Sequence, residues 1–426
     1  MMERYKEYKD SGVKWLGEIP SHWEVVRGLG VFSENKSKNT QLENSTVLSL
    51  SYGKIIVKKD IDSGLVPEEY SSYQIVRPGC IIVRSTDLQN DKTSLRIGYV
   101  CDEGIITSAY LGLQVKGNNN DKYLYYFLHD WDITKEIYRH GNGLRQSLSW
   151  NDLRDISVLL PPLSEQDAIV SYLDSATSEI DKAIAMQQKM IDLLNERKQI
   201  IIQNAVTKGL DENVEMKESG VEWIGRIPKH WEVLKLKRCA IIKTGTTPPT
   251  SNLEYFENGD IPWFTPGDLN EMNLHLSSKT ITKKAIDGNV GRLFPAKSIY
   301  FVGIGATVGK VASCDFEASS NQQINAIMCN DRLDYKFATY CLLMEQKIIR
   351  ETTNFVTLPI LNQSSTGLID IVVPPKSEQQ QIVSYLDGEM EKFDTAISNC
   401  QRQITLLKER KQIIINEVVT GKVRVS

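Results

Sequence analysis

The sequence predicts a mixed α/β fold in which two α/β domains are joined by two long helices that form an antiparallel intramolecular coiled coil, with a pseudo-twofold internal repeat. Three observations lead to this prediction. The chain carries the same short motifs twice, a long apolar seam closes each copy, and the blocks between the motifs mix strand-like and helix-like segments. Each copy of a long repeat is one structural unit.

The repeat is visible at its edges, where three pairs of segments correspond. They are SGVKWLGEIPSHWEV at 11–25 with SGVEWIGRIPKHWEV at 219–233, PPLSEQ at 161–166 with PPKSEQ at 374–379, and LLNERKQIII at 193–202 with LLKERKQIII at 406–415. The blocks between these edges, at about 26–160 and 234–373, have drifted apart. Two like frames around two unlike inserts indicate one scaffold with two different recognition surfaces.

The repeat also sets the expected domain boundaries. A chain of 426 residues holds about two to four domains at roughly 100–200 residues each. We expect an N-terminal motif with a first variable domain at 1–160 and a first long helix at 161–210. We expect the repeated motif with a second variable domain at 211–373 and a second long helix at 374–426.

Each variable block has the pattern of a compact α/β domain. β-Branched and aromatic runs bounded by Gly and Pro predict strands, and longer amphipathic runs predict helices. In the first block we expect strands at 46–50, 54–57 and 80–83 and a helix at 122–128. In the second block we expect strands at 298–302 and 324–328 and a helix at 335–349.

The two long helices are expected at 164–206 and 377–419. Apolar residues recur there in steps of three and four, as in a coiled coil, and Ser164 and Ser377 are candidate N-caps. About 43 residues make a rod of roughly 65 Å, which cannot bury its apolar seam alone. Its twin is the expected partner, and the alternative is that each helix packs only on its neighbouring domain. The basic pairs 197–198 and 410–411 are expected on the solvated face.

The order of the motifs along the chain is circular. The repeated motif at 219–233 follows the first long helix, whereas nothing follows the second long helix near 422. If each motif packs at the end of a helix, the N-terminal copy closes onto the end of the C-terminal helix.

Composition excludes several classes of protein. No apolar run approaches the ~20 residues needed to span a bilayer, and we expect a cytoplasmic protein. The seven cysteines contain no C-x-x-C pair, which argues against a disulfide framework and a zinc knuckle. The net charge of −4 gives no sign of nucleic-acid binding, although a local basic face is compatible with a balanced total.

The doubled motifs resemble those of the specificity (S) subunits of type I restriction-modification systems, and the resemblance covers nearly the whole chain. Its carriers are the S-G-V-x-W motif, the P-P-x-S-E-Q turn and the E-R-K-Q-I-I-I helix end, each present twice. Within the blocks, GTTPP at 245–249 followed by IPWFTPGDL at 261–269, GLRQSL at 143–148 and NQQ at 321–323 resemble stretches of target recognition domains.

The resemblance implies a non-catalytic DNA-reading component of an adenine-specific DNA methyltransferase and type I restriction endonuclease complex. Two target recognition domains would each read one half of a split double-stranded DNA site, and the two repeated helices would hold them apart. Two modification (methyltransferase) subunits would dock on the frame and carry the S-adenosylmethionine, with no cofactor in this chain. Two restriction (translocase/nuclease) subunits would join where the system has them.

The residues themselves offer no catalytic or metal-binding group. FVGIG at 301–305 spells a short form of an S-adenosylmethionine loop but lacks the partner [ND]-P-P-[YFW] motif. GATVGK at 305–310 fails the spacing of a phosphate-binding loop. The five histidines have no metal-ligand spacing. We therefore expect no catalytic residues and no metal site.

Candidate DNA-binding residues are those whose side chains can bind base edges or phosphates. Base edges are read by Arg, Lys, Asn and Gln, and phosphates are bound by hydroxyls and cations. Loops rich in these groups supply the candidates Arg84, Ser85, Thr86, Gln89, Asn90, Lys92, Asn142, Arg145 and Gln146 in the first block, and Lys243, Thr244, Thr246, Thr247, Thr265, Lys310, Asn321, Gln322 and Gln323 in the second. Trp263 is expected to anchor its loop.

The sequence is compatible with two other functions. Each candidate taken singly is compatible with an ordinary solvated loop residue. A coiled-coil protein-interaction scaffold without DNA readout would show the same repeat, and a catalytic methyltransferase is the third alternative.

Overall fold

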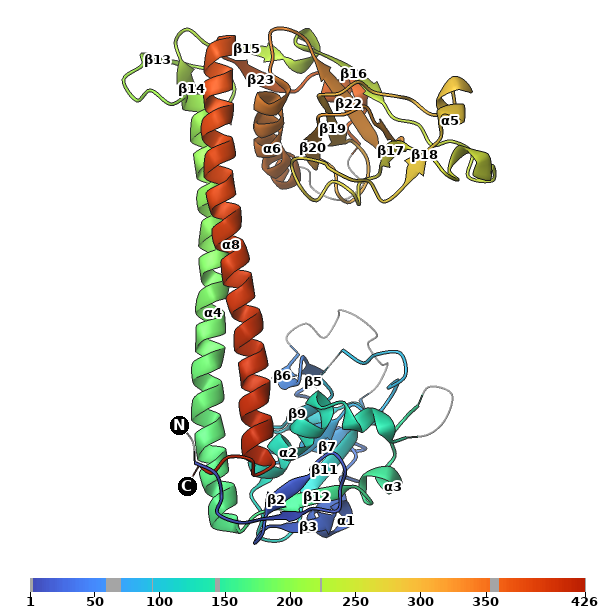
Figure 1. The fold of residues 1–426 in the computed structure, drawn as a ribbon, viewed down its shortest axis with the longest axis vertical. Helices are drawn as coiled ribbons and strands as arrows, with labels where there is room; N and C mark the ends of the chain where they lie inside the picture. The colour runs from blue at the N-terminus through green and yellow to red at the C-terminus, as the bar shows by residue number, and fades with distance from the viewer. Residues whose placement is uncertain are drawn as a thin grey trace. The chain divides into compact units, whose positions relative to one another are not determined.

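The computed structural model describes residues 3–58, 70–93, 95–141, 146–222, 224–352 and 360–425, with side chains omitted at 345–352. The chain divides into two compact units, Met1–Gln188 with Gln401–Ser426, and Lys189–Cys400 (Figure 1). Each unit contains one variable block, one copy of the repeated motif and one half of each long helix. No helix in the described part of the chain is long and apolar enough to cross a membrane.

The two long helices run antiparallel in each unit. They are α4 (Leu163–Lys208) and α8 (Lys376–Val419), drawn side by side in Figure 1. In the first unit Ile169, near the start of α4, shares a core with Val418 at the end of α8. In the second unit Ile202, near the end of α4, shares a core with Ile382 at the start of α8. The predicted antiparallel pairing is therefore confirmed.

The predicted N-caps are wrong. The helices begin at Leu163 and Lys376, so Ser164 and Ser377 lie inside the first turn. The carbonyl of Pro162 accepts the backbone N–H groups of Glu165 and Gln166, at 2.9 and 3.0 Å. Proline is favourable at a helix start because it has no N–H group to satisfy, and each helix begins two residues earlier than an N-cap at Ser164 or Ser377 predicts.

The basic pairs, expected on the solvated face, divide in two: Arg197 and Arg410 are exposed, whereas Lys198 and Lys411 are half-buried and paired. Lys411 Nζ lies 2.7 Å from Asp181 Oδ1 in the first unit, and Lys198 Nζ lies 2.5 Å from Asp394 Oδ1 in the second. These ion pairs join α4 to α8. The two helices are alike and antiparallel, so the same pair of positions meets once in each unit.

The N-terminal segment closes onto the end of α8, as the circular order of the motifs predicts. Strand β1 (Tyr8–Asp10) pairs with β2 (Glu18–Pro20). The Tyr8 hydroxyl donates to the carbonyl of Gly421 at 3.2 Å, and the Arg424 N–H donates to the carbonyl of Glu3 at 2.8 Å. In the second unit the same hairpin, β13 (Met216–Glu218) with β14 (Arg226–Pro228), follows α4 directly along the chain.

The variable domain of the first unit is built on a four-stranded antiparallel sheet. Its order is β4 (Phe32–Glu34), β11 (Leu111–Val115), β8 (Ile81–Val83), β9 (Ile97–Tyr99). Helix α2 (Asp121–Ile133) shares the main core with this sheet. The remaining elements are β3 (Glu24–Arg27) paired with β12 (Ser157–Leu160), β5 (Leu48–Ser51) with β6 (Lys54–Val57), β7 (Gln74–Val76) with β10 (Gly104–Ile106), and the short helices α1 (Gly28–Val31), η1 (Glu136–Arg139) and α3 (Trp150–Leu153).

The variable domain of the second unit has a matching four-stranded sheet, with helix α6 (Tyr335–Thr352) in the core. The sheet order is β16 (Ala240–Thr244), β22 (Ile324–Cys329), β19 (Ser298–Val302), β20 (Val311–Cys314). A second sheet joins β18 (Thr280–Ile281), β17 (Ile261–Phe264) and β21 (Ser319–Ser320), with β17 and β21 parallel. The others are β15 (Glu232–Lys235) paired with β23 (Asp370–Val373), η2 (Leu236–Arg238), η3 (Leu253–Tyr255), α5 (Lys283–Asp287) and α7 (Gln363–Thr366).

The expected strands and helices of the variable blocks are all present. The strand expected at 46–50 begins two residues later, as β5, and the helix expected at 122–128 extends to Ile133. Burial explains the longer helix, because Trp131 near its end is 1% exposed and completes the core of the first unit.

Candidate nucleic-acid interface

Two loops meet in the second unit and bring predicted residues together. The first leaves β16, and the second joins β21 to β22. The Thr246 N–H donates to the carbonyl of Ser320 at 2.9 Å, and the Thr247 hydroxyl hydrogen-bonds the side-chain oxygen of Gln322. A Cβ atom at Gly245 would lie 2.3 Å from the Ser320 carbonyl oxygen, so this close approach requires glycine.

An open cavity of about 500 Å³ lies over these loops. Gly245, Thr246, Thr247, Pro249, Val290 and Gln322 line it. Thr247 and Gln322 are exposed. A hydroxyl beside a carboxamide offers both donors and acceptors, and glutamine is the usual bidentate partner of adenine in the major groove. The cavity is therefore the strongest candidate for base readout in this unit.

Trp263 holds the first loop in place, as predicted. The indole is 5% exposed, and its Nε1–H donates to the carbonyl of Thr246 at 3.0 Å. Because the ring is buried, it cannot stack on a base. The Thr246 hydroxyl is also buried and has no hydrogen-bond partner in the described part of the chain.

The other predicted residues of the second block have different surroundings. Lys243 is exposed on β16, next to Thr244, whose hydroxyl donates to Asn325 at 2.8 Å. Thr265 is tied into its own turn, since its hydroxyl and its N–H donate to one oxygen of Asp268 at 2.7 and 2.8 Å. Burial acts to raise the pKa of the Asp268 carboxyl, but the hydrogen bonds from Thr265 and Ser278 outweigh it and lower this pKa.

The remaining three candidates are held by local contacts. Asn321 donates to the side-chain oxygen of Gln323 at 3.0 Å and accepts its N–H at 3.0 Å, which shapes the turn that presents Gln322. Lys310 donates to Asn270 at 3.1 Å. Sequence reasoning missed Arg292, which is exposed and donates to the carbonyl of Thr244. A single arginine in a loop gives no signal that would have singled it out.

The candidate loop of the first unit is organised by a buried arginine that sequence reasoning also missed. Arg96 is 0% exposed, and its guanidinium donates to the carbonyls of Arg84, Thr86, Asp87 and Asp91. Because one guanidinium hydrogen-bonds four carbonyls of the same loop, it fixes the shape of that loop.

This fixed loop presents three of the predicted side chains to solvent. Gln89, Asn90 and Lys92 are exposed, with Asn90 donating to Asp87 at 2.8 Å. Ser85 is buried and donates to the carbonyl of Ala109 at 3.3 Å, and Arg84 lies 3.3 Å from a carboxylate oxygen of Asp91.

A second loop packs against the first through Gln146. Its side chain donates to the carbonyls of Tyr138 and His140 at 2.7 and 2.8 Å, and its own carbonyl accepts the Leu88 N–H at 3.1 Å. Asn142 and Arg145, also predicted in this loop, lie outside the described residues.

Each variable domain is attached to a long helix by the same contacts. In the first unit Asp174 of α4 accepts Lys122 at 2.5 Å and the Tyr126 hydroxyl at 2.9 Å. In the second unit Asp387 of α8 accepts Lys336 at 2.9 Å and the Tyr340 hydroxyl at 2.7 Å. Sequence reasoning missed this attachment, although a K-x-x-x-Y pattern stands about 38 residues before each PPxSEQ turn.

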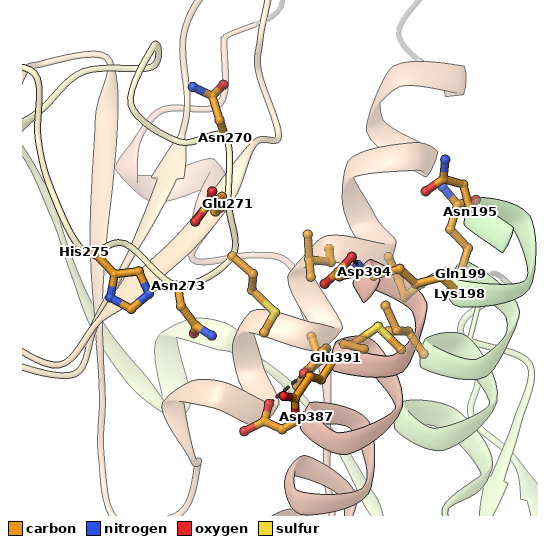
Figure 2. Close-up of a pocket in the computed structure, with 16 residues that line it drawn as sticks. Asn195, Lys198, Gln199, Asn270, Glu271, Asn273, His275, Asp387, Glu391 and Asp394 are labelled. Carbon is orange, nitrogen blue, oxygen red and sulfur yellow. Dashed lines mark hydrogen bonds and ion pairs between the residues drawn. The ribbon is translucent and has the colours of Figure 1, made fainter. Parts of the chain in front are cut away.

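A separate cleft of the second unit has an acidic lining. It holds about 910 Å³ between α4, α6, α8 and the loop at 270–275, and Figure 2 shows the labelled carboxylates, Glu271, Asp387, Glu391 and Asp394, around it. Lys198 pairs with Asp394 and Lys336 with Asp387, which leaves an excess of negative charge. Such a cleft repels phosphates, so it is unsuited to DNA.

No group of three or more His, Cys, Asp or Glu side chains in the described ranges is placed to hold a metal ion.

Comparison with known proteins agrees with this architecture. A family described as "Type I restriction modification DNA specificity domain" matches residues 20–189 and 228–408. The chain is 25% identical over 447 residues to the putative type I restriction enzyme MjaX specificity subunit of Methanocaldococcus jannaschii, covering 100% of this chain and 99% of that protein. It is 27% identical over 289 residues to the type I restriction enzyme EcoR124I/EcoR124II specificity subunit of Escherichia coli, covering 64% and 63%.

One solved structure has the same fold along nearly the whole chain. It is described as "Structural basis underlying complex assembly and conformational transition of the type I R-M system" and shares 15% identity with a TM-score of 0.71. The alignment covers 94% of this chain and 98% of that one. The match supports the paired long helices and the two mixed α/β domains.

Proposed function

This chain belongs to the family of type I restriction-modification DNA specificity proteins, and from that premise we propose that it reads a split double-stranded DNA target, one half with each variable domain. One observation carries the proposal. The two units attach their variable domains through matching Lys, Tyr and Asp contacts, whereas their exposed loops carry different reading groups. Two similar attachments that carry different loops are what the reading of two independent half-sites requires.

The proposal assigns a role to each part of the chain. Residues 1–160 and 211–373 each hold one reader with its motif. Residues 161–210 and 374–426 are spacers, whose length sets the number of unspecified base pairs between the half-sites. The segments 161–206 and 374–419, which run from each PPxSEQ turn to near the end of each long helix, differ in sequence but have the same length. A constant length is expected of a spacer.

The chain is proposed to act without chemistry of its own. Two modification subunits would bring S-adenosylmethionine and transfer its methyl group to adenine, and two restriction subunits would join them where the system has them. The acidic cleft beside α8 supports the docking of a basic protein segment. The purified chain alone should transfer no methyl group, and adenine methylation should appear when modification subunits are added.

A domain exchange tests the proposal. Residues 26–160 are replaced by the corresponding block of another specificity subunit, and the bound DNA is selected from random duplexes by the complex with modification subunits. One half-site should change while the other stays the same. A change in both halves, or a continuous site, would contradict the two-reader proposal.

The second candidate is a protein-interaction scaffold without DNA readout. The net charge of −4 and the acidic cleft favour it. A mobility shift on random duplex pools separates the two, since a scaffold would leave the DNA unshifted with or without modification subunits.

A further inference from the structure

The repeat builds the same joint twice, at the start of each long helix. In the first unit His22 Nε2 lies 2.6 Å from Glu165 Oε1, and the Trp23 indole donates to Glu165 Oε2 at 3.0 Å. A third group completes this joint. The Tyr5 hydroxyl donates to Glu165 Oε2 at 2.9 Å, and its ring meets the Trp23 ring edge-on at 5.6 Å.

Tyr5 is a fixed part of the first joint. Burial, with the hydrogen bond to Glu165 adding to it, raises the pKa of the Tyr5 hydroxyl well above its ordinary value, so the hydroxyl stays a donor. Burial acts to raise the pKa of the Glu165 carboxyl, but the hydrogen bonds from Trp23, His22 and Tyr5 outweigh it and lower this pKa. Hydrogen bonds to an ionised carboxylate are among the strong ones in proteins.

The second joint lacks the third group. His230 Nε2 lies 2.7 Å from Glu378 Oε1, and the Trp231 indole donates to Glu378 Oε2 at 2.9 Å. No other hydrogen bond to the Glu378 carboxylate is present in the described part of the chain, and its side chain is 36% exposed against 19% for Glu165.

The chain has asparagine where a tyrosine would complete the second joint. Gly12 corresponds to Gly220, and the same spacing pairs Tyr5 with Asn213. The backbone supports this correspondence, because the same hydrogen bond is present in both copies. The Ser21 N–H donates to the Glu7 carbonyl at 3.0 Å, and the Lys229 N–H donates to the Glu215 carbonyl at 2.7 Å.

A cavity lies at the second joint. It holds about 350 Å³. Its apolar lining is Leu210, Val214, Pro228 and Ile382, and its polar lining is Glu378, His230, Lys208, Asp211 and Gln381. In the first joint the corresponding space is next to Tyr5, which bonds Glu165, meets the His22 ring at 5.7 Å and packs against the cluster of Ile169 and Trp23. We call this space the Glu378 cavity.

We propose that the Glu378 cavity binds a tyrosine side chain that an extended segment of a partner protein presents. The apolar part of the lining next to the Glu378 carboxylate suits a phenol, because the ring is buried there and the hydroxyl donates to the free acceptor site of Glu378 Oε2. Phenylalanine supplies no donor for this carboxylate.

The occupant is a partner protein and not a second copy of this chain. Tyr5 of any copy is already engaged with its own Glu165, and its segment is fastened by Tyr8 to Gly421 and by Glu3 to Arg424. A second copy would have to release all of these contacts. The proposal rests on the proposed function only in that it requires a partner subunit.

The first experiment measures binding of a labelled peptide with the sequence of residues 2–9, MERYKEYK, to the purified full chain by fluorescence anisotropy. The same peptide with Tyr5→Phe should bind about tenfold more weakly or worse, because it loses a hydrogen bond to a charged group. Asn213→Tyr in the chain should abolish binding by filling the cavity with the chain's own phenol. Asn213→Ser is the matched control and should bind as the parent does.

The outcomes separate the alternatives. Absence of peptide binding at millimolar concentration overturns the proposal, and so does equal binding by the Tyr and Phe peptides. Binding that Asn213→Tyr leaves unchanged would place the peptide at the first joint and also overturn it. A dimer in sedimentation that Asn213→Tyr dissolves would make a second copy the occupant.

The second experiment tests the partner directly. Asn213→Tyr should weaken assembly with the modification subunit at least tenfold relative to Asn213→Ser, and unchanged assembly would refute a partner tyrosine. Neither measurement uses DNA, so failure of DNA recognition leaves this test intact, and failure here leaves the two-reader proposal intact.

Discussion

Lys198 of α4 and Asp394 of α8 form an ion pair across the two long helices, with Nζ 2.5 Å from Oδ1. The repeat places the same pair in the other unit as Lys411 with Asp181, at 2.7 Å. Both lysines belong to the E-R-K-Q motif. In an antiparallel pair of like helices, one lysine in each copy therefore gives one ion pair between α4 and α8 in each unit.

Reversal of one charge should weaken this register. Lys198→Glu places two carboxylates together and should lower the free energy of unfolding by about 1 kcal/mol, the upper range for an exposed pair. Adding Asp394→Lys should restore most of it in a double-mutant cycle from urea unfolding. This pair is preferred to Lys411–Asp181 because Lys54 also lies 3.6 Å from Asp181.

The pair Lys392–Glu389, on one turn of α8, is the control for that cycle. Its reversal should have little effect, because it does not join the two helices. A double variant at 198 and 394 that stays as weak as Lys198→Glu would show that the pair does not set the register.

The frame could be predicted from the sequence because its signals are local or repeated. The antiparallel helices could be predicted because apolar residues recur every three or four positions in two segments of equal length. The buried Arg96 could not be predicted, since a lone arginine normally lies at the surface, and its four acceptors are assembled only by the fold. The contact of Thr247 with Gln322 joins loops 75 residues apart, which no local pattern encodes.

Asp130 should make the first unit less stable as pH rises. Its carboxylate is 0% exposed, both its oxygens accept from Asn416, and burial, partly offset by Asn416 and Lys422, raises its pKa from 3.8 to about 6. The folded state therefore binds this proton more tightly than the unfolded state. The penalty is absent below pH 4, develops between about pH 4 and 6, and is complete above pH 6.

Asp130→Asn should remove that penalty. The variant should be more stable than the parent at pH 7.5, by at most about 3 kcal/mol for a shift of roughly two units, and equal to it near pH 4. Urea midpoints at the two pH values measure this difference. Asp155→Asn, at an exposed carboxylate, is the control, and a stability gain from Asp130→Asn that persists at pH 4 would contradict the assignment.

Gln322 should read one half of the DNA target. Gln322→Ala removes the carboxamide from the cavity beside Thr247, and discrimination at one base pair should fall by about 1–3 kcal/mol, the usual value of a bidentate base contact. Selection of bound DNA by the complex with modification subunits measures it. Lys229→Ala, a surface cation of the repeated frame, should leave the selected sequence unchanged, and relaxation of both half-sites by Gln322→Ala would argue against a local reader.

Lengthening both long helices should change the gap of the DNA target and leave its half-sites unchanged. The ion pairs Lys198–Asp394 and Lys411–Asp181 mark matched positions of the two helices. The midpoints between these positions are Lys189–Met190 in α4 and Arg402–Gln403 in α8. Four residues added at each point extend the helices by ~6 Å, close to two base-pair rises of ~3.4 Å. Four residues also keep the apolar seam, with its steps of three and four residues, nearly in phase, so the helices should still pair.

Target selection should show a gap about two base pairs longer. The control adds four residues after Gly117, in a surface loop, and should keep the gap. An unchanged gap after the helix insertions would refute the spacer role, and altered half-sites would show that the helices also shape the readers.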